Sequence, residues 1–537
     1  QDLPLACLAR WEQEQAHRRY LTQPMGSGAV QEITWAQAAD QVRRLAQWMR
    51  SQDWPAGSCV AIIGKNSAHW ILADLAIWMA GHISVPIYPT FNADALAYIL
   101  EHSEAKACFI GKMDDTSNLR ALPEQLPRIA LPLAPAIDAL QWSDLLAGTA
   151  PLAAYPTPDM DATCTIIYTS GTTGKPKGVV QTYRSMAWGV SSATRRVRMD
   201  RNDRYISYLP LAHVVERVLV EHGWLRTGMH IFFAESLDTF AADMQRTRPT
   251  IFFSVPRLWV KFQHGVHHKM PQSKLDLLLS IPIVRGLVRK KILGALGLDQ
   301  CRMAAGGAAP MPLPLLQWYS KLGLPINEGY GMTESSPISV GNPAASTRRP
   351  GAIGIPFPST RVRVVEPGNP YAEVALGAPG ELLVQGPQVF AGYWNRGEET
   401  AATLLPEGWL RTGDIVVQDA DGFLRLVDRI KEVVLVGGFN VYPSEVERAI
   451  AALPGVADVA VTSLPDGDHD IVVAAVVATA SGSITPEAIR LACREVLAAY
   501  KVPRKVFLVE SLPRSVVGKV LRKQVRDMLV ENDGATT

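Results

Sequence analysis

Residues 59–88 read CVAIIGKNSAHWILADLAIWMAGHISVPIY and have the pattern of a strand, a helix and a second strand. The run Cys59 to Ile63 is apolar and β-branched, as in a buried strand, and Ser67 to Met79 has helical length. The stretch from residue 69 to 88 is about as long as a membrane span, but Asp74, His82 and Pro86 interrupt it. We therefore predict a buried helix leading into a strand, which is a βαβ unit of a parallel sheet.

The same alternation continues through the first half of the chain. Further helices are predicted at Trp35–Ser51 and Ala93–His102, and further strands at Ala107–Ile110, Tyr205–Tyr208 and Ile251–Ser254. These segments predict an α/β fold with a largely parallel sheet.

After Gly351 the pattern changes to short strands separated by Pro/Gly turns, which predicts an antiparallel or barrel-like region. Its predicted strands are Arg361–Val365 and Glu381–Val384. Beyond Arg429 the chain is long enough for a small domain of its own. Its predicted elements are the strands Ala457–Thr462 and Ile471–Ala478 and the helix Pro486–Ala499. We place the two domains at residues 1–430 and 431–537.

Composition excludes several classes of protein. The chain has 537 residues and a formal net charge of +2, so no global field favours nucleic acid as a partner. The six cysteines are scattered without a CxxC pair, which indicates neither a disulfide framework nor a zinc site and fits a reducing compartment. The N-terminus lacks the pattern of a secretory signal. A cytoplasmic protein is expected.

A segment rich in Gly, Ser and Thr, Tyr168 to Gly178, reads YTSGTTGKPKG and follows a predicted strand. Glycines let the backbone expose successive N–H groups, which form a phosphate cradle together with hydroxyls and a cation. The pattern is not GxxxxGK[ST], so a common P-loop is disfavoured. The alternative is an ordinary polar turn. The small residues of this segment are Thr169, Ser170, Gly171, Thr172, Thr173 and Gly174, and Lys175 and Lys177 lie just beyond them.

Five further segments carry residues suited to nucleotide chemistry. They are AGGAAP (residues 305–310) with NEGYGMTE (327–334), WLRTGD (409–414), DRIKEVVLVGGFNVYP (428–443) and PRSVVGKVLRK (513–523). Tyr330 can stack on a purine, Glu334 offers hard oxygen ligands for Mg²⁺, and Asp414 can accept hydrogen bonds from ribose hydroxyls. Taken singly, each segment also fits a plain turn or a solvated surface residue.

Together and in this order, the segments resemble the ANL superfamily of adenylate-forming enzymes, over roughly residues 34–523. LPLAHVVER (residues 209–217) and GYGMTESSP (residues 329–337) look most like its long-chain acyl-CoA synthetase branch. The resemblance implies a large N-terminal domain of layered α/β sheets with a small β-barrel-like subdomain. It also implies a small, mobile α+β C-terminal domain.

The resemblance also assigns roles to residues. Residues 169–174 and Lys177, the phosphate loop, would hold the β- and γ-phosphates of ATP. Thr333 would contact the α-phosphate, and Glu334 would bind the Mg²⁺ ion. Lys519 would meet the substrate carboxylate and the α-phosphate, and Lys431 matches the hinge between the domains. The adenine would be bound by Gly307, Ala308, Asn327, Tyr330 and Gly331. The ribose would be held by Asp414 and Arg429. The thiol step would involve Gly437 and Gly438.

The implied reaction joins a carboxylic acid to coenzyme A through an acyl-adenylate, with ATP, Mg²⁺ and coenzyme A taking part. A medium- or long-chain fatty acid is the leading substrate. Alternatives are a CoA ligase for an aryl or specialised acid, or an acyl-AMP ligase that loads a carrier protein. A non-catalytic nucleotide-binding interaction protein is the alternative from another class. Oligomeric state, as monomer or homodimer, is open.

Two positions depart from relatives within the superfamily. Amino-acid-activating relatives carry an aspartate where His213 falls, so His213, which we include in the predicted active site, argues against an α-amino acid substrate. Some bacterial fatty-acid relatives place a gating tryptophan where Arg217 falls, so this gate is absent or built differently here.

The segment Lys274 to Leu298 combines leucines with a cluster of basic residues. We favour an ordinary helix pair with a solvated basic face. The alternative is an amphipathic element that lies peripherally on a membrane surface.

Overall fold

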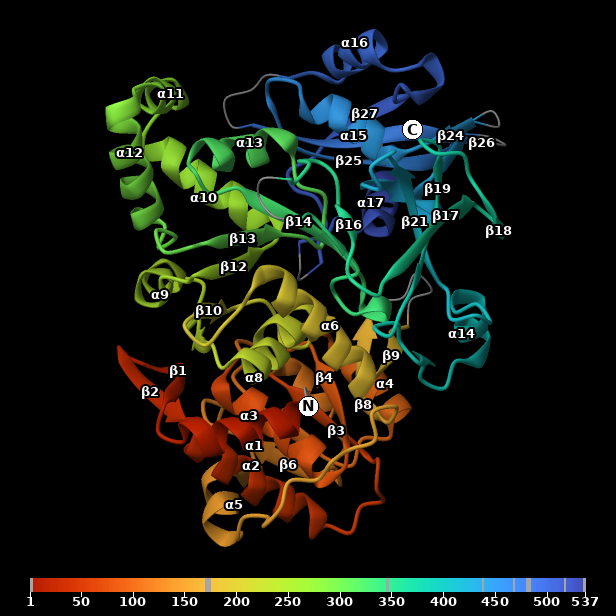
Figure 1. Ribbon diagram of the computed structural model, residues 1–537. Helices are drawn as coiled ribbons and strands as arrows, with labels where there is room; N and C mark the ends of the chain where they lie inside the picture. The colour runs from red at the N-terminus through yellow and green to blue at the C-terminus, as the bar shows by residue number, and fades with distance from the viewer. Residues whose placement is uncertain are drawn as a thin grey trace.

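The computed structural model describes residues 3–169, 175–343, 347–436, 439–466, 469–479, 484–515 and 518–534. A large N-terminal part contains four sheets with helices packed against them, and a smaller C-terminal part lies across one end (Figure 1). Within these residues, no helix is long and apolar enough to cross a membrane.

The largest sheet has eight strands and contains the predicted βαβ unit. From edge to edge its strands are β20 (Gly392–Tyr393), β9 (Lys177–Thr182), β8 (Thr163–Thr169), β4 (Ile83–Ile87), β3 (Cys59–Ile63), β5 (Cys108–Ile110), β6 (Arg128–Ala130) and β7 (Leu140–Gln141). Strand β3 pairs in parallel with both β4 and β5, which confirms the predicted parallel arrangement.

Helix α3 (Ala68–Ala80) connects β3 to β4 and is buried along its whole length. Ser67 caps its N-terminus by accepting a hydrogen bond from the Trp70 N–H, and Gly81 ends it with a φ of +89°. A helix that is apolar on all sides must be buried in protein or lipid. Here it is buried in protein, and its one acidic residue, Asp74, forms an ion pair with Arg217. The prediction of a buried helix instead of a membrane span is confirmed.

Two smaller sheets complete the α/β layers. One consists of β12 (Ile251–Ser254), β13 (Met303–Gly306), β14 (Ile326–Tyr330), β15 (Val340–Gly341) and β16 (Ile355–Pro356), and the other of β10 (Arg204–Ser207), β11 (His230–Phe233), β1 (Arg19–Gly26) and β2 (Ala29–Thr34). The other long helices here are α1 (Pro4–Gln15), α2 (Trp35–Arg50), α4 (Ala93–Ser103), α6 (Tyr183–Val197) and α13 (Leu313–Lys321). Helices α2 and α4 confirm the predictions.

The region after Gly351 forms a five-stranded antiparallel sheet, as predicted. Its order is β18 (Asn369–Glu373), β17 (Arg361–Glu366), β19 (Pro379–Gln385), β21 (Leu410–Gln418) and β22 (Leu424–Arg429). The short helix α14 (Gly397–Thr403) precedes β21.

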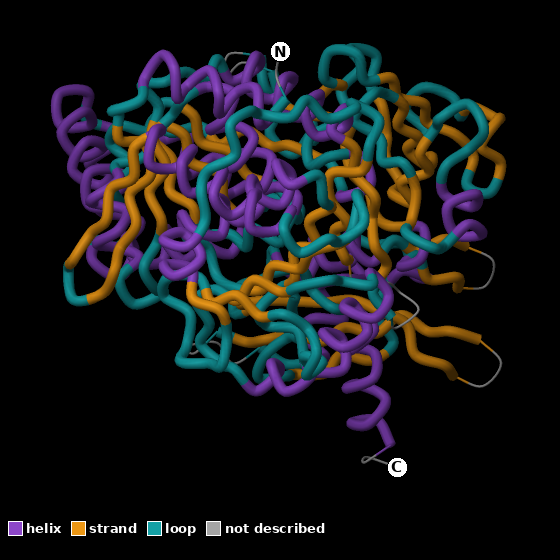
Figure 2. The backbone as a smooth tube through the Cα atoms, turned by 90° about the horizontal axis from the view of Figure 1, so that it is seen from below, coloured by secondary structure: helices purple, strands orange, loops and turns teal. Residues whose placement is uncertain are grey.

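The C-terminal part is α+β. It contains β23 (Val434–Val436), β24 (Phe439–Val441), β25 (Val456–Asp466), β26 (His469–Ala478), β27 (Lys505–Leu508), α15 (Pro443–Ala451), α16 (Pro486–Val496) and α17 (Arg522–Gly534). Helix α17 leaves the body at the C-terminus in Figure 2. Helix α16 ends three residues before the predicted Ala499. There the chain becomes extended, Tyr500 stacks on Phe439, and Lys501 forms an ion pair with Glu445 at 2.8 Å.

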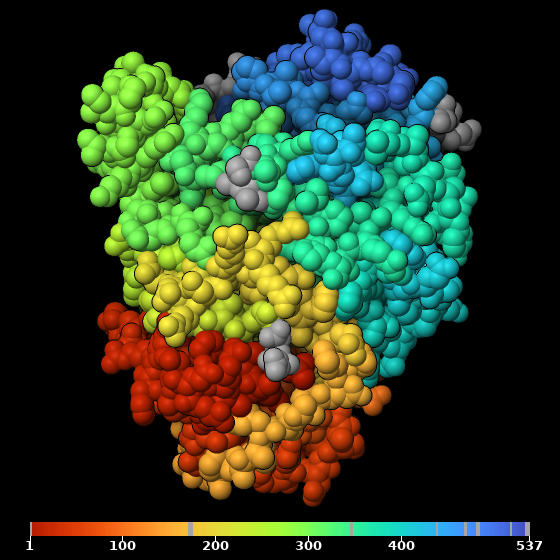
Figure 3. Space-filling model, in the orientation of Figure 1, coloured from red at the N-terminus to blue at the C-terminus, as the bar shows by residue number. Residues whose placement is uncertain are grey.

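The segment after β12 forms three helices, α10 (Pro256–Lys269), α11 (Gln272–Ser280) and α12 (Pro282–Ala295). Helices α11 and α12 confirm the predicted helix pair and form a lobe at one edge of the molecule (Figures 1 and 3). Leu275 and Ile292 anchor this pair in the core around Trp259 and Trp318.

Candidate active site

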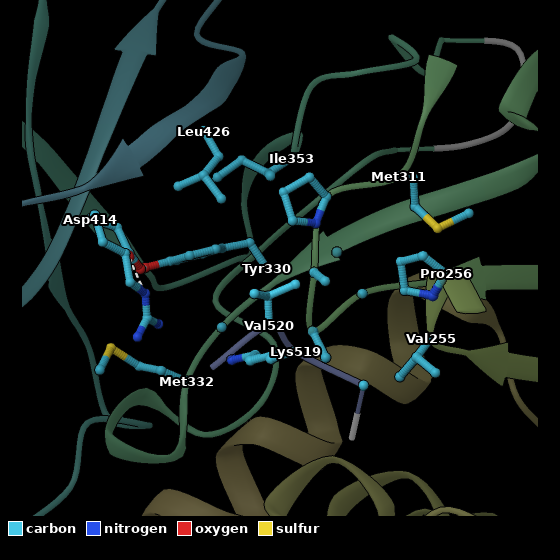
Figure 4. Close-up of a pocket in the computed structure, with 18 of the residues that line it drawn as sticks. Val255, Pro256, Met311, Tyr330, Met332, Ile353, Asp414, Leu426, Lys519 and Val520 are labelled. Carbon is cyan, nitrogen blue, oxygen red and sulfur yellow. Dashed lines mark hydrogen bonds and ion pairs between the residues drawn. The ribbon is translucent and has the colours of Figure 1, made fainter. Parts of the chain in front are cut away.

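A cavity of about 3010 Å³ lies between the sheets of the N-terminal part and the C-terminal part. Sites for one small ligand typically measure roughly 300–1,000 Å³, so this cavity has room for more than one substrate. Figure 4 shows Lys519 and Val520 from the C-terminal part opposite Tyr330 and Met332 from the N-terminal part. The predicted site residues therefore converge from both parts of the chain.

The predicted phosphate loop lies between two antiparallel strands. Residues 170–174, which include five of the predicted binding residues, lie outside the described residues. Thr169 and Lys177 flank them and pair across β8 and β9. The Lys177 ammonium lies 5.2 Å from the ring centroid of Tyr393, whose hydroxyl donates a 2.8 Å hydrogen bond to Glu334 Oε1. Tyr393 therefore contacts Lys177 through its ring and Glu334 through its hydroxyl.

Thr333 and Glu334 form a 3₁₀ turn directly after β14. Gln181 fixes this turn by donating a 2.5 Å hydrogen bond to the Thr333 carbonyl, and the Phe390 N–H donates to the Glu334 carbonyl at 2.8 Å. Burial raises the pKa of Glu334, whereas Tyr393, Arg429 and Lys519 oppose the rise. A buried carboxylate facing a cavity is costly unless a cation or donor joins it there.

The predicted adenine site combines close backbone approach with one unsatisfied polar atom. A Cβ on Gly331 would lie 2.3 Å from the Pro337 carbonyl oxygen, and one on Gly307 would lie 3.0 Å from the Gly329 oxygen. Ala308 has a φ of +66° and lines the same cavity. Asn327 Oδ1 is buried and has no hydrogen-bond partner among the described residues. An amino group entering the cavity would satisfy it.

Asp414, Arg429 and Tyr330 form a hydrogen-bonded cluster on the cavity wall. Figure 4 labels Asp414 and Tyr330. The Tyr330 hydroxyl donates to Asp414 Oδ2 at 2.6 Å, and Arg429 Nε lies 3.0 Å from Asp414 Oδ1. Asp414 and Arg429 are paired residues of β21 and β22, so the sheet register brings them together. The Arg429 side chain is 49% exposed, so the cluster is accessible from the cavity.

Lys519 lies in a tight turn of the C-terminal part, where the Ser515 N–H donates to its carbonyl at 2.8 Å and Gly518 has a φ of +81°. Burial, followed by the Arg429 charge, lowers the pKa of Lys519, and Asp414 and Glu334 oppose that shift. The Lys519 amine therefore lies among groups contributed by residues 334, 414 and 429, which are distant from it in the sequence.

His213 caps the short helix α7 (Val214–Glu216) and lines the cavity. Its Nδ1 accepts a 3.2 Å hydrogen bond from the Val215 N–H. Burial, with the nearby Lys519 charge, lowers the pKa of His213 to about 4. The ring is neutral near pH 7, and because Nδ1 accepts, the proton is on Nε2.

Lys431 lies in a 3₁₀ turn (Ile430–Glu432) directly after β22 and also lines the cavity. Beyond this turn, Arg522 forms ion pairs with Glu432 and, at 2.7 Å, with Glu447. Gly437 and Gly438, the predicted thiol-step residues, lie outside the described residues.

One wall of the cavity is apolar, and sequence motifs did not identify it. Val215 contributes to it from α7, Leu219 from the π-helical turn η2 (Arg217–His222), and Ile251, Phe253 and Met303 from two strands. Val215 belongs to the segment 209–217 quoted above, and only packing brings the strand residues beside it. Sequence reasoning also missed Tyr393, which orients Glu334 and whose only signal is its place in a turn-rich segment.

Arg217 lies behind this wall at the start of a π-helical turn, η2 (Arg217–His222), and is fully buried. It donates to Asp74, to Thr165 Oγ1 at 2.7 Å and to Glu221 Oε2 at 3.3 Å. Arg217 is therefore part of a buried ion cluster and is not among the residues that line the cavity.

Comparison with known sequences identifies the class of protein. The profile of the AMP-binding enzyme family matches residues 8–394, and that of the AMP-binding enzyme C-terminal domain matches residues 445–519. The chain belongs to the AMP-binding enzyme family of adenylate-forming enzymes. It is an AMP-forming acid–thiol ligase with the ANL fold, and enzymes of this family use ATP and coenzyme A.

Relatives with different acids resemble the chain to the same degree. The mitochondrial malonate–CoA ligase of Mus musculus is 31% identical over 88% of this chain and 81% of its own. A long-chain-fatty-acid–CoA ligase of Yersinia pestis is 30% identical over 96% and 93%, and a feruloyl-CoA synthase of Amycolatopsis is 31% identical over 92% and 93%. The crystal structure of ATP-bound MatB from Rhodopseudomonas palustris aligns with a TM-score of 0.83 and 26% identity over 98% of both chains.

Proposed function

We propose that this ligase activates a medium- or long-chain fatty acid. The acid and ATP would give acyl-AMP and pyrophosphate, and acyl-AMP and coenzyme A would then give acyl-CoA and AMP. The observation that carries the choice of acid is the apolar wall formed by Val215, Leu219, Ile251, Phe253 and Met303. Each methylene that leaves water for such a wall contributes about 0.8 kcal/mol to binding.

The cations beside the wall support a monocarboxylate over a dicarboxylate. Arg196 donates to the carbonyl oxygens of Gly341 and Pro356 at 3.1 and 3.2 Å. Arg302 forms an ion pair with Asp203 at 2.6 Å. His213 is neutral near pH 7 because its pKa is lowered to about 4. A second substrate carboxylate would therefore have to compete with these partners for Arg196 and Arg302, at a desolvation cost, which leaves Arg257 as an exposed cation of the cavity lining.

ATP fits the opposite side of the cavity. The unsatisfied Asn327 Oδ1 would accept from the adenine amino group, and Tyr330 would stack on the ring beside Gly307 and Ala308. Asp414 would accept hydrogen bonds from the ribose hydroxyls, with Arg429 and Tyr330 holding its carboxylate in place.

Charge neutralisation would fall to Lys519 and to a Mg²⁺ ion held by Glu334. The Lys519 ammonium would hold the substrate carboxylate against the α-phosphate, and the His213 Nε2–H would donate to the same carboxylate. Among the described residues, no group of three or more His, Cys, Asp or Glu is placed to hold a metal. The Glu334 carboxylate would instead bind Mg²⁺ together with phosphates and water, where the ion would supply additional charge neutralisation.

The second half-reaction would need Lys519 to leave the cavity. We propose that the C-terminal part, from residue 431 onward, rotates about Lys431 and brings the segment containing Gly437 and Gly438 to the site. The junction between β22 and β23 is a single short turn, which is typical of a hinge.

A panel of acids tests the substrate proposal through CoA thioester formation. Octanoate should exceed butanoate by roughly 100-fold in kcat/KM, because four methylenes contribute about 3 kcal/mol. Dodecanoate should exceed malonate and ferulate by at least as much. Higher kcat/KM for malonate or ferulate would contradict the fatty-acid proposal, and transfer to a carrier protein in place of coenzyme A would contradict the proposed acceptor.

A further inference from the structure

The helical hairpin α11–α12 exposes large aliphatic side chains on its outer surface. Ile283 is 87% exposed, Leu287 70% and Leu277 64%, and Ile281 joins them at the turn between the helices. Ile283 and Leu287 are one helical turn apart and therefore share a face. These four exposed side chains, which we call the hairpin tip, belong to the α11–α12 lobe that stands out at one edge of the molecule in Figure 3.

This exposure does not result from a loosely attached hairpin. The inner face is buried through Leu275 and Ile292. Arg289 donates to the Lys321 carbonyl at 2.8 Å, and Lys321 forms an ion pair with Asp276 at 3.2 Å. The hairpin is thus fixed to the body on one side and presents the tip outward on the other.

Positive charge surrounds the tip. Residues 256–295 contain eight Lys and Arg residues and one acidic residue, Asp276, which gives this segment a net charge of +7. Since the whole chain has a net charge of +2, the remaining residues sum to −5. Lys290 and Lys291 lie one turn beyond Leu287 and are exposed, and Lys274 lies one turn before Leu277 and is also exposed. The charge of the molecule is therefore concentrated around its most exposed aliphatic cluster.

We infer that the hairpin tip docks the enzyme on an anionic phospholipid surface. Aliphatic side chains with flanking lysines are the combination that peripheral membrane elements use, since the apolar groups enter the interface and the lysines meet phosphates. A second copy of the chain is disfavoured as the occupant, because two segments of charge +7 would repel each other. The helix pair and its exposed lysines agree with the sequence-based interpretation, and the exposed aliphatic tip adds the feature that favours the membrane alternative.

Helix α10 connects the hairpin to the active site along the chain. Helix α10 begins with Pro256 and Arg257, which line the cavity, and it ends two residues before α11. A helix of 14 residues is about 21 Å long. Docking at the tip would hold the cavity a short distance from the bilayer. This inference does not depend on which acid the enzyme uses.

Flotation of the full-length protein with lipid vesicles tests the inference. Binding should be strong to phosphatidylcholine vesicles that contain phosphatidylglycerol, weak to pure phosphatidylcholine, and lost at high salt. The double variant Ile283→Ser/Leu287→Ser should lower the affinity at least tenfold. Leu237→Ser is the matched control, because Leu237 is also 87% exposed but lies outside the hairpin.

A second pair of variants isolates the charge. Lys290→Glu/Lys291→Glu should lower vesicle affinity by more than tenfold, since each lysine near an anionic surface adds about fivefold. Lys106→Glu/Arg120→Glu makes the same charge change at exposed positions elsewhere and should have little effect. Equal loss in both double variants, equal binding to uncharged vesicles, or a dimer that Ile283→Ser/Leu287→Ser dissociates would each overturn the inference. Thioester formation with a soluble acid should stay unchanged in all four variants.

Discussion

Two clusters in this enzyme are each built on an ion pair between an arginine and an aspartate, one buried and one open to the cavity. The sealed cluster consists of Arg217, Asp74 and Glu221, all with fully buried side chains. The open cluster consists of Asp414, Arg429 and Tyr330, and its arginine is 49% exposed. Burial of the first cluster makes every charge dependent on its partner, whereas the second has hydrogen-bonding capacity left for a ligand.

Protonation separates the two clusters further. Burial, reinforced by Asp74, raises the pKa of Glu221 well above its ordinary value. Asp74 Oδ1 and Glu221 Oε1 both lack another partner in the part of the chain that the structure describes. One proton on Glu221, donated to Asp74, satisfies both oxygens and leaves the sealed cluster neutral with Arg217. A neutral, fully bonded cluster is suited to stabilising the fold.

Removing the arginine of the sealed cluster should have the largest effect. Arg217→Met leaves two buried carboxyl groups without their cation, so the free energy of unfolding should fall by about 3–5 kcal/mol. Urea denaturation measures this change. Adding Asp74→Asn and Glu221→Gln should restore part of the loss. Unchanged stability combined with a raised KM for ATP would show that the sealed cluster acts on the ligand after all.

In the cavity that the open cluster lines, Lys519→Ala should lower the rate of carboxylate-dependent pyrophosphate exchange by roughly 100- to 1,000-fold. The substitution removes a cation that would stabilise the charge developing in the transition state. Thioester formation from supplied acyl-AMP should remain near the wild-type rate. The unfolding midpoint should not move. Equal loss of both half-reactions would count against the alternation of domains.

The same substitution in both clusters gives a direct comparison. Asp414→Asn should raise the KM for ATP by about 10- to 100-fold, as expected for losing charged hydrogen bonds worth about 1.5–3 kcal/mol. Asp74→Asn should leave that KM unchanged and lower the melting temperature. Steady-state kinetics with thermal denaturation of both variants checks the pair. If both variants changed the same quantity, the distinction between the clusters would fail.

The smallest effect is a shift in pH dependence. The pKa of Lys519 is lowered, so the lysine loses its proton below the ordinary value of 10.5. Adenylation needs the charged form and should therefore fall as the pH rises through this lowered pKa. Thioester formation from acyl-AMP, which does not use Lys519, should lack this alkaline limb. Profiles of the two half-reactions that fall together would argue against the assigned role.

The sequence predicted the fold class and many residues that line the cavity, for a local reason. A βαβ unit is determined by the hydrophobic pattern of some thirty residues, and β3, α3 and β4 form as that pattern indicates. The site motifs consist of neighbouring residues whose backbone conformations and ligand atoms are properties of a short segment. The end of α16 was predicted too late because contacts with Phe439 and Glu445, distant in sequence, end the helix.

Sequence alone thus determined that this chain forms an α/β enzyme with adenylate-forming chemistry, and it named Glu334, Asp414 and Lys519. Only the tertiary structure brought these three groups to one cavity, built the apolar wall, sealed Arg217 away from solvent and left Ile283 exposed. Local structure and local ligand groups depend on residues that are close together in the sequence. Burial, pocket shape and surface exposure depend on packing between segments hundreds of residues apart, and no short pattern records them.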